Sequence, residues 1–126
     1  MRGSVEVTWP RANVMRTTVR GHADDAIASA HIREATAAYR GGTSVHHFFD
    51  LEEMTSYESS ARIELTHFAI RERAHVASAI FIVRSKLVAM GVSTAALAAR
   101  LVGLEFVVLH RRADFERRIA ERLATR

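Results

Sequence analysis

Histidine is the first residue type to consider for chemistry, because the chain has seven histidines and no cysteine. Histidine is a common catalytic base and metal ligand. His46 and His47 are adjacent in a predicted strand and so point to opposite faces, where they cannot bind one ion together. His67 and His75 lie about two helical turns apart, which is too far for joint chelation. We therefore expect packed or solvated histidines, no metal site and no bound cofactor.

The usual catalytic motifs are missing from the sequence. It has no glycine-rich phosphate loop, no nucleophile elbow and no His-Glu-x-x-His zinc motif. Serine, histidine and aspartate residues are present, but no spacing among them indicates a catalytic triad. The sequence therefore predicts a protein that is not an enzyme.

Hydroxyl and carboxylate groups are concentrated in residues 50–65, between a predicted strand and a predicted helix. A serine at the start of that helix could accept a phosphate, because free backbone N–H groups and the helix dipole favour negative charge there. Glu52, Glu53 and Glu58 would repel the dianion, so phosphorylation would change the electrostatics of this surface without ordering it. In the alternative interpretation three residues only cap the helix, namely Thr55, Ser56 and Ser59.

The composition indicates one globular domain over residues 1–126. The chain has 48% apolar residues, 25% charged residues and a single proline. A domain of this size buries enough surface to fold without a disulfide or a structural metal. The lack of cysteine favours the reducing cytoplasm. The longest apolar stretches, Val76–Val83 and Leu87–Val92, are much shorter than the roughly 20 residues of a membrane-spanning helix, so no membrane span or signal peptide is predicted.

Positive charge is concentrated at the C-terminal end of the sequence. The net charge is +4, and most of the excess lies in residues His110–Arg126. This segment predicts a helix with a solvated outer face, on which Glu116 and Glu121 supply local ion pairs. A single aromatic residue, Tyr57, does not make a stacking surface for bases, so no nucleic-acid partner is expected.

Alternation of polar and apolar residues predicts an opening β-hairpin. Its strands are expected around Val5–Trp9 and Val14–Arg20, joined by a turn at the single proline. A helix capped by Asp24 or Asp25 should follow, and it should end before Gly41.

The middle of the chain predicts a strand, a helix and a second strand. Ser44–Leu51 has β character. Thr55-x-x-Glu58 matches a capping box, which predicts a helix from there to about Ala74. Val76–Val83 is almost wholly apolar, as expected of a strand buried on both faces.

The last third of the chain predicts two helices around one strand. Ser85–Leu101 is helical in composition, and whether Gly91 and Ser93 divide it is left open. Leu104–Leu109 should be the last strand, and Asp114 should cap the final helix. The order β-β-α-β-α-β-α-β-α predicts one α/β domain with a mixed sheet, because right-handed crossovers pair the later strands in parallel.

Residues 50–61 resemble the signature of the STAS domain, which is found in sulfate transporters and anti-sigma factor antagonists. That signature reads D-L-S-G-V-x-x-x-D-S-S-G-L, and STAS domains have the element order predicted here. Asp50-Leu51 matches its start, Met54 occupies its apolar position, and Glu58-Ser59-Ser60-Ala61 stands where D-S-S-G is usual. Glutamate replaces the aspartate and alanine replaces the glycine, so the chain resembles a divergent, anti-anti-sigma-like member.

The resemblance implies a non-enzymatic regulator that binds a protein partner through residues 50–62. The family suggests a partner with a kinase-like ATPase fold, such as an anti-sigma factor. The phosphorylatable serine of the family corresponds to Ser60, with Ser59 as the neighbouring candidate. The expected partner-binding residues are Asp50, Glu52, Glu53, Thr55, Ser56, Tyr57, Glu58 and Arg62.

Two alternatives to partner binding remain at this point. STAS-like sheets can hold an apolar molecule, and Leu87–Val92 is unusually apolar for the start of a helix, so a domain that binds a small apolar ligand or a lipid is the first alternative. A structural module that self-associates into a homo-oligomer is the second.

Overall fold

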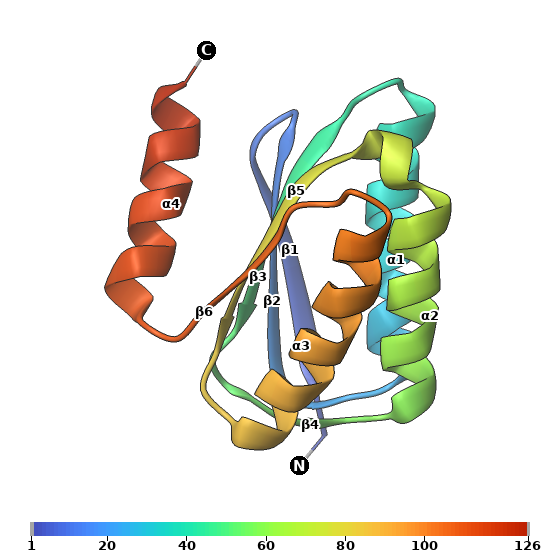
Figure 1. The fold of residues 1–126 in the computed structure, drawn as a ribbon, viewed down its shortest axis with the longest axis vertical. Coiled ribbons are helices and arrows are strands. Elements are labelled where there is room, and N and C mark those ends of the chain that lie inside the picture. The colour runs from blue at the N-terminus through green and yellow to red at the C-terminus, as the bar shows by residue number, and fades with distance from the viewer. Residues whose placement is uncertain (1, 126) are drawn as a thin grey trace.

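The computed structural model describes residues 2–125 and confirms the alternation of strands and helices after an opening hairpin (Figure 1). Its elements are β1 (Ser4–Arg11), β2 (Val14–Ala23), α1 (Asp25–Arg40), β3 (Val45–Leu51), β4 (Met54–Tyr57), α2 (Ser59–Arg71), a 3₁₀ turn (Arg73–His75), β5 (Val76–Val83), α3 (Lys86–Leu101), β6 (Phe106–Leu109) and α4 (Arg112–Ala124). Across residues 2–125, no helix has both the length and the apolar character that crossing a membrane requires.

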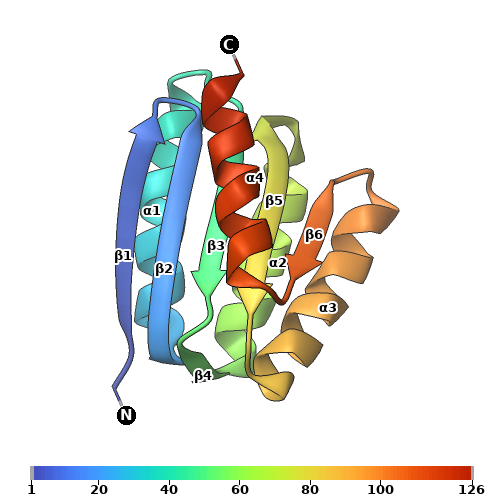
Figure 2. The ribbon, with the colours of Figure 1, turned by 90° about the vertical axis from the view of Figure 1, so that its left-hand side faces the viewer.

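The sheet grows in one direction along the chain. Its order is β1-β2-β3-β5-β6, with β1 antiparallel to β2 and the later pairs parallel, and the short β4 pairs with the end of β2. Right-handed crossovers between such neighbouring strands all fall on the same side of the sheet. Helices α1, α2 and α3 therefore cover one face, and α4 alone crosses the other (Figure 1 and Figure 2). This mixed sheet is the fold class that the sequence predicts.

The two faces of the sheet carry separate apolar cores. Met15 and Phe81 belong to the core under α1, α2 and α3, whereas Val14, Phe48 and Phe115 belong to the core under α4. Successive residues of β2 supply opposite cores because side chains alternate between the faces of a strand. β5 lies between β3 and β6, and its almost wholly apolar sequence fits burial on both faces, as predicted.

The predicted capping box at Thr55 and Glu58 is wrong. β4 occupies this segment and pairs in parallel with the end of β2, so the backbone is extended where the pattern predicts a helix. α2 starts at Ser59, with Glu58 as its N-cap, and ends at Arg71 rather than near Ala74. The local pattern failed because the pairing partner of β4 is distant in the sequence.

The structure resolves the open question about α3 and corrects the predicted start of the last helix. α3 is continuous through Gly91, and the Ser85 hydroxyl accepts a hydrogen bond that caps its first turn. Gly91 permits close packing, because a Cβ atom there would collide with the Tyr57 hydroxyl. α4 begins at Arg112, so Asp114 lies inside its first turn instead of capping it.

Replacing Phe115 with alanine tests how far α4 depends on its apolar contacts. Phe115 is fully buried, and its ring lies edge-on to that of Phe48 at 6.1 Å. The free energy of unfolding of Phe115→Ala, measured by urea denaturation, should be about 3–5 kcal/mol lower. Ile63→Ala, on the exposed side of α2, serves as the control and should cost less than about 1 kcal/mol. Equal losses in the two variants would contradict this account of α4.

Candidate functional site

The structure divides the predicted partner-binding segment, residues 50–62, between two faces of the molecule. Asp50 and Glu52 turn toward α4, where arginines bind them. Asp50 is only 6% exposed, so it does not lie on a surface that a partner could contact. Glu53 and Thr55 are exposed, and the segment then continues into the first turns of α2.

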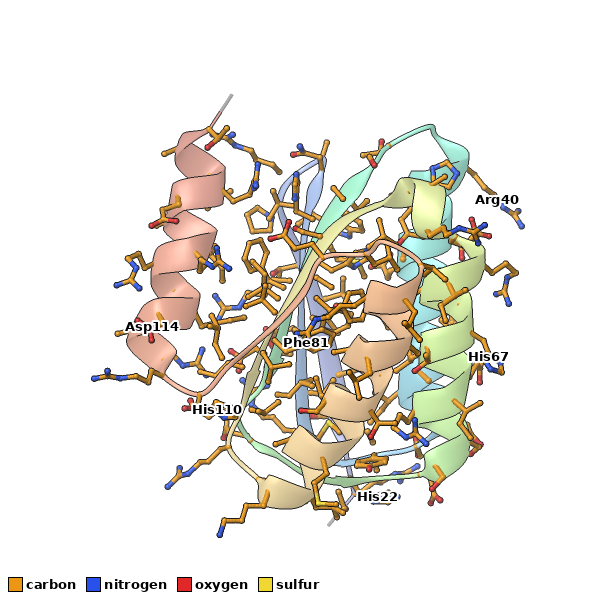
Figure 3. All side chains as sticks on the ribbon, in the orientation of Figure 1. His22, Arg40, His67, Phe81, His110 and Asp114 are labelled. Carbon is orange, nitrogen blue, oxygen red and sulfur yellow. The ribbon has the colours of Figure 1, made fainter. Side chains whose placement is uncertain are left out.

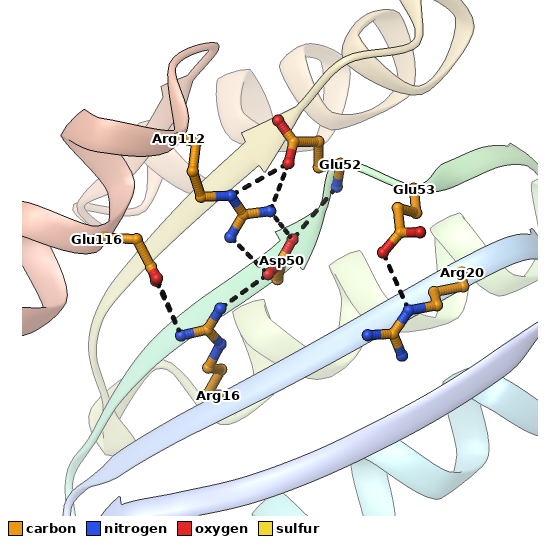
Figure 4. Close-up of polar contacts among 7 residues, drawn as sticks. All are labelled: Arg16, Arg20, Asp50, Glu52, Glu53, Arg112 and Glu116. Atoms are coloured by element: carbon orange, nitrogen blue, oxygen red, sulfur yellow. Dashed lines mark hydrogen bonds and ion pairs between the residues drawn. The ribbon is translucent and has the colours of Figure 1, made fainter.

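Two arginines hold the Asp50 carboxylate (Figure 4). Arg112, the first residue of α4, donates from Nη1 and Nη2 to the two carboxylate oxygens at 2.8 and 2.9 Å. Arg16 of β2 donates from Nη2 at 2.9 Å. The same arginines bind two further carboxylates: Glu52 lies 2.7 Å from Arg112, and Glu116 lies 2.9 Å from Arg16. This cluster therefore links α4 to β2 and β3.

The charges in this cluster stabilise one another. Burial alone would raise the pKa of Asp50, but the hydrogen bonds from Arg112 and Arg16 outweigh it and hold that pKa below its ordinary value of 3.8. The pKa of Arg112 is raised, chiefly by its hydrogen bond to Asp50. Both guanidinium groups also lie 5.7 Å from the centre of the Phe115 ring. Asp50 therefore acts as a structural carboxylate.

The ion pairs of α4 differ in part from the predicted solvated helix face with local pairs. Glu116 pairs with Arg16 of β2 instead of a neighbour on α4. Glu121 does lie near Arg117, at 3.9 Å, as helical spacing predicts. Because Arg112 is bound to the sheet, part of the positive charge of α4 is neutralised within the molecule.

The exposed polar residues of the segment lie at the end of the molecule where β2, β4 and α2 meet. Glu53 pairs with Arg20 at 3.1 Å, and Glu58 pairs with His22 at 3.0 Å. Nδ1 of His22 hydrogen-bonds with the Ser56 hydroxyl at 2.7 Å. These contacts join β4 and the start of α2 to the end of β2.

Both candidate phosphoacceptors, Ser59 and Ser60, are exposed in the first turn of α2. The Ser60 hydroxyl donates a hydrogen bond to Asp25 of α1 at 2.8 Å, which links the starts of the two helices. A phosphate on Ser60 would remove this donor and place a dianion beside the Asp25 carboxylate. Ser60 is thus accessible, and a charge there would disturb the contact between α1 and α2.

Apolar side chains adjoin this surface; the sequence shows the apolar stretch Leu87–Val92 but does not place it here. Half-buried Tyr57 packs against Gly91, which places the first half of α3 beside β4. From this part of α3, Leu87 and Met90 are 51% and 69% exposed. Exposed Leu97 follows Met90 by seven residues, which is two helical turns, so Leu87, Met90 and Leu97 share a helical periodicity that could have identified an outward-facing apolar stripe.

Two histidines are buried under α1, α2 and α3. His31 hydrogen-bonds with the Thr17 hydroxyl at 2.9 Å, and Nε2 of His47 with the Tyr39 hydroxyl at 2.6 Å. Burial lowers the pKa of His31 to about 4 and that of His47 well below 6.5, so both rings are neutral near pH 7. His46 faces the other side of the sheet, as predicted. In the part of the chain that the structure describes, no three histidine or acidic side chains are grouped as a metal site requires.

Replacing Asp50 with asparagine should destabilise the domain, because Arg112 and Arg16 would lose their shared carboxylate. We expect the free energy of unfolding to fall by about 2 kcal/mol, less than for a fully buried pair because both arginines are partly exposed. Glu53→Gln is the matched control, since it removes the exposed partner of Arg20 and should cost less than about 0.5 kcal/mol. Urea denaturation of both variants makes the comparison, and a loss for Asp50→Asn no larger than the control's would refute the structural role.

The buried histidines predict a loss of stability in mild acid. The unfolded chain takes up protons as the pH falls through 6.5, whereas native His31 resists protonation until about pH 4. His31 alone should therefore lower the free energy of unfolding by about 2 kcal/mol between pH 7 and pH 5, and His47 should add to this loss. Urea denaturation at the two pH values measures it. His31→Gln should weaken the pH dependence of the free energy of unfolding, and exposed His67→Gln should leave it unchanged. If His67→Gln weakened this pH dependence more than His31→Gln, burial of His31 would not be the cause.

Comparison with solved structures identifies the fold. The chain is similar to an uncharacterized protein of the DUF3478 family from Shewanella loihica PV-4 with a SpoIIAA-like fold, at a TM-score of 0.65 and 10% sequence identity over 91% of each chain. It is also similar to the anti-sigma factor antagonist SpoIIAA in its unphosphorylated form, at a TM-score of 0.65 and 14% identity over 97% of this chain and 100% of that one. No protein-family model and no curated protein matches the sequence. The domain therefore has the SpoIIAA-like fold.

Proposed function

We propose that this domain is a non-enzymatic regulator that binds another protein through the surface around the start of α2. The observation that carries the proposal is that Ser59 and Ser60 are exposed there, at the same end of the molecule as the start of α3 with its exposed apolar side chains of Leu87 and Met90 (Figure 1). The SpoIIAA-like fold agrees with this proposal, since SpoIIAA is an anti-sigma factor antagonist. We expect the protein to act in the cytoplasm, in keeping with a chain that has no cysteine.

The contact surface in this proposal consists of Glu53, Thr55, Glu58, Ser59, Ser60, Leu87 and Met90. Asp50 and Glu52 are left out because Arg112 of α4 binds both. The contact surface combines acidic residues with two large apolar side chains. A partner with basic residues around an apolar pocket would complement it in charge and shape. A kinase-like ATPase of the anti-sigma type is the partner class that the STAS resemblance favours.

Phosphorylation of Ser60 is the proposed switch. In the unmodified domain its hydroxyl donates to Asp25, whereas a phosphate would present a dianion to Asp25 and to nearby Glu58. Repulsion would displace the first turn of α2 from α1. It would also place an unpaired charge in the interface, and burying such a charge strongly opposes binding.

Affinity capture with variant baits tests both the surface and the switch. The unmodified domain should retain a specific protein from a lysate of the source organism, identified by quantitative mass spectrometry. Ser60→Asp and Leu87→Glu should each reduce the retained amount about tenfold or more, because each introduces a charge into the interface. Ser60→Ala, which adds no charge, should retain the partner.

Arg40→Glu is the control for a charge change outside the contact surface. Arg40 lies at the end of α1, at the opposite end of the molecule from His22, which marks the neighbourhood of the contact surface (Figure 3). It should bind the partner as the unmodified domain does. Retention of one partner by every bait would place the interface elsewhere. If light scattering showed that the domain associates only with itself and no partner were retained, the domain would be a self-associating module instead.

A further inference from the structure

A cavity of about 130 Å³ lies between the sheet and helices α1, α2 and α3. Its wall is almost entirely apolar, and Val19, Phe49, Leu51 and Phe81 contribute to it. Phe81, labelled in Figure 3, lies in this layer between the sheet and the three helices. An apolar cavity of similar size in another protein holds a benzene molecule. This cavity therefore has room for a molecule with roughly one six-membered ring.

One buried polar atom of a wall residue has no partner. His47 lines the cavity and is 3% exposed, and its Nδ1 has no hydrogen-bond partner among residues 2–125. The other ring nitrogen, Nε2, lies 2.6 Å from the Tyr39 hydroxyl. Buried polar groups in folded proteins are nearly always hydrogen-bonded, because leaving one unpaired is costly. His47 is therefore a wall residue with one buried ring nitrogen that no described residue satisfies.

The hydrogen-bond pattern indicates which form Nδ1 takes. Burial keeps the His47 ring neutral, and burial also raises the pKa of Tyr39, so the phenol keeps its proton. If Tyr39 donates to Nε2, the one unsatisfied group is an N–H at Nδ1. If Nε2 donated instead, the Tyr39 proton and the Nδ1 lone pair would both lack partners among the described residues. The first arrangement leaves fewer groups unsatisfied, so His47 carries a free N–H donor.

We infer that this cavity binds a small uncharged molecule that has an apolar body of about one ring and a carbonyl oxygen, which accepts a hydrogen bond from Nδ1 of His47. Water fits less well, because a buried water needs about two to four polar partners. The wall offers few such partners, because it is almost entirely apolar and its Thr17 and His31 side chains hydrogen-bond with each other at 2.9 Å. Asp24 and Arg62 line the cavity where it reaches the surface between α1 and α2, which offers a route of access. This inference does not depend on the proposed partner surface.

Cyclohexanone and methylenecyclohexane are matched probes for this site. The two molecules have nearly the same shape, but only the ketone has a hydrogen-bond acceptor. In titrations of the intact domain followed by ¹⁵N–¹H NMR, cyclohexanone should bind about tenfold more tightly than methylenecyclohexane. The Nδ1 resonance of His47 should shift with the ketone and not with the hydrocarbon.

The double variant Tyr39→Phe/His47→Phe provides the second comparison. It removes both members of the hydrogen-bonded pair together, so it leaves no new unpaired polar group while keeping two aromatic rings in the wall. In a variant whose NMR spectrum remains that of a folded domain, the two probes should bind with equal affinity. If the variant does not fold, the Nδ1 resonance of the unmodified domain remains as the deciding measurement.

Two results would overturn the inference. Failure of both probes to bind the unmodified domain would mean that the cavity is closed to ligands or filled by water. Equal affinity for the two probes, with no shift at Nδ1, would mean that His47 recognises nothing. Neither result bears on the partner surface, because the affinity captures use different residues and a different readout.

Discussion

The burial of α4 against one face of the sheet is the constraint on which the rest of the structure depends. Because each parallel strand is added on the same side of the one before it, the crossovers gather α1, α2 and α3 on one face and leave the other open. That open face carries the apolar side chains of Phe48 and Ile82, which must be buried from water. α4 buries these side chains by packing Phe115 against them. The ion pair between Arg112 and Asp50 holds the start of the helix at the end of β3. The topology thus requires a final helix that returns across the sheet.

This constraint also decides which residues are left for function. In a parallel sheet, the carboxyl ends of the strands and the amino ends of the following helices meet at one end of the domain, where ligands and partners commonly bind. Ser60 and Leu87 lie at that end, near the starts of α2 and α3. Asp50 also ends a strand, but the alternation along β3 assigns it to the same face as Phe48. One contiguous segment of the sequence therefore has two separate roles: its first part attaches α4 to the sheet, and its second part lies on an exposed surface.

The sequence predicts this structure where the signal lies within one segment. The apolar run Val76–Val83, the cap at Asp24 and the end of α1 are all confirmed. It fails where the deciding contact is distant: Thr55 lies in a strand because β4 pairs with β2, although its spacing from a glutamate also fits a capping box. Asp50 pairs with arginines of β2 and α4, and His47 pairs with a tyrosine of α1. These partners belong to other elements of the chain, so no local pattern predicts the pairs.

α2 connects the two proposed sites because it contributes to both. Ala61 and Phe68 line the cavity, and Ser60 lies on the outer surface. Among the three helices on this face, α2 buries the fewest residues, so its apolar attachment to the sheet is the weakest. A molecule in the cavity would add apolar contacts beneath α2, whereas a charge on Ser60 would push its first turn away from Asp25. Since the two events would act on the same helix in opposite directions, thermodynamic linkage requires each to oppose the other.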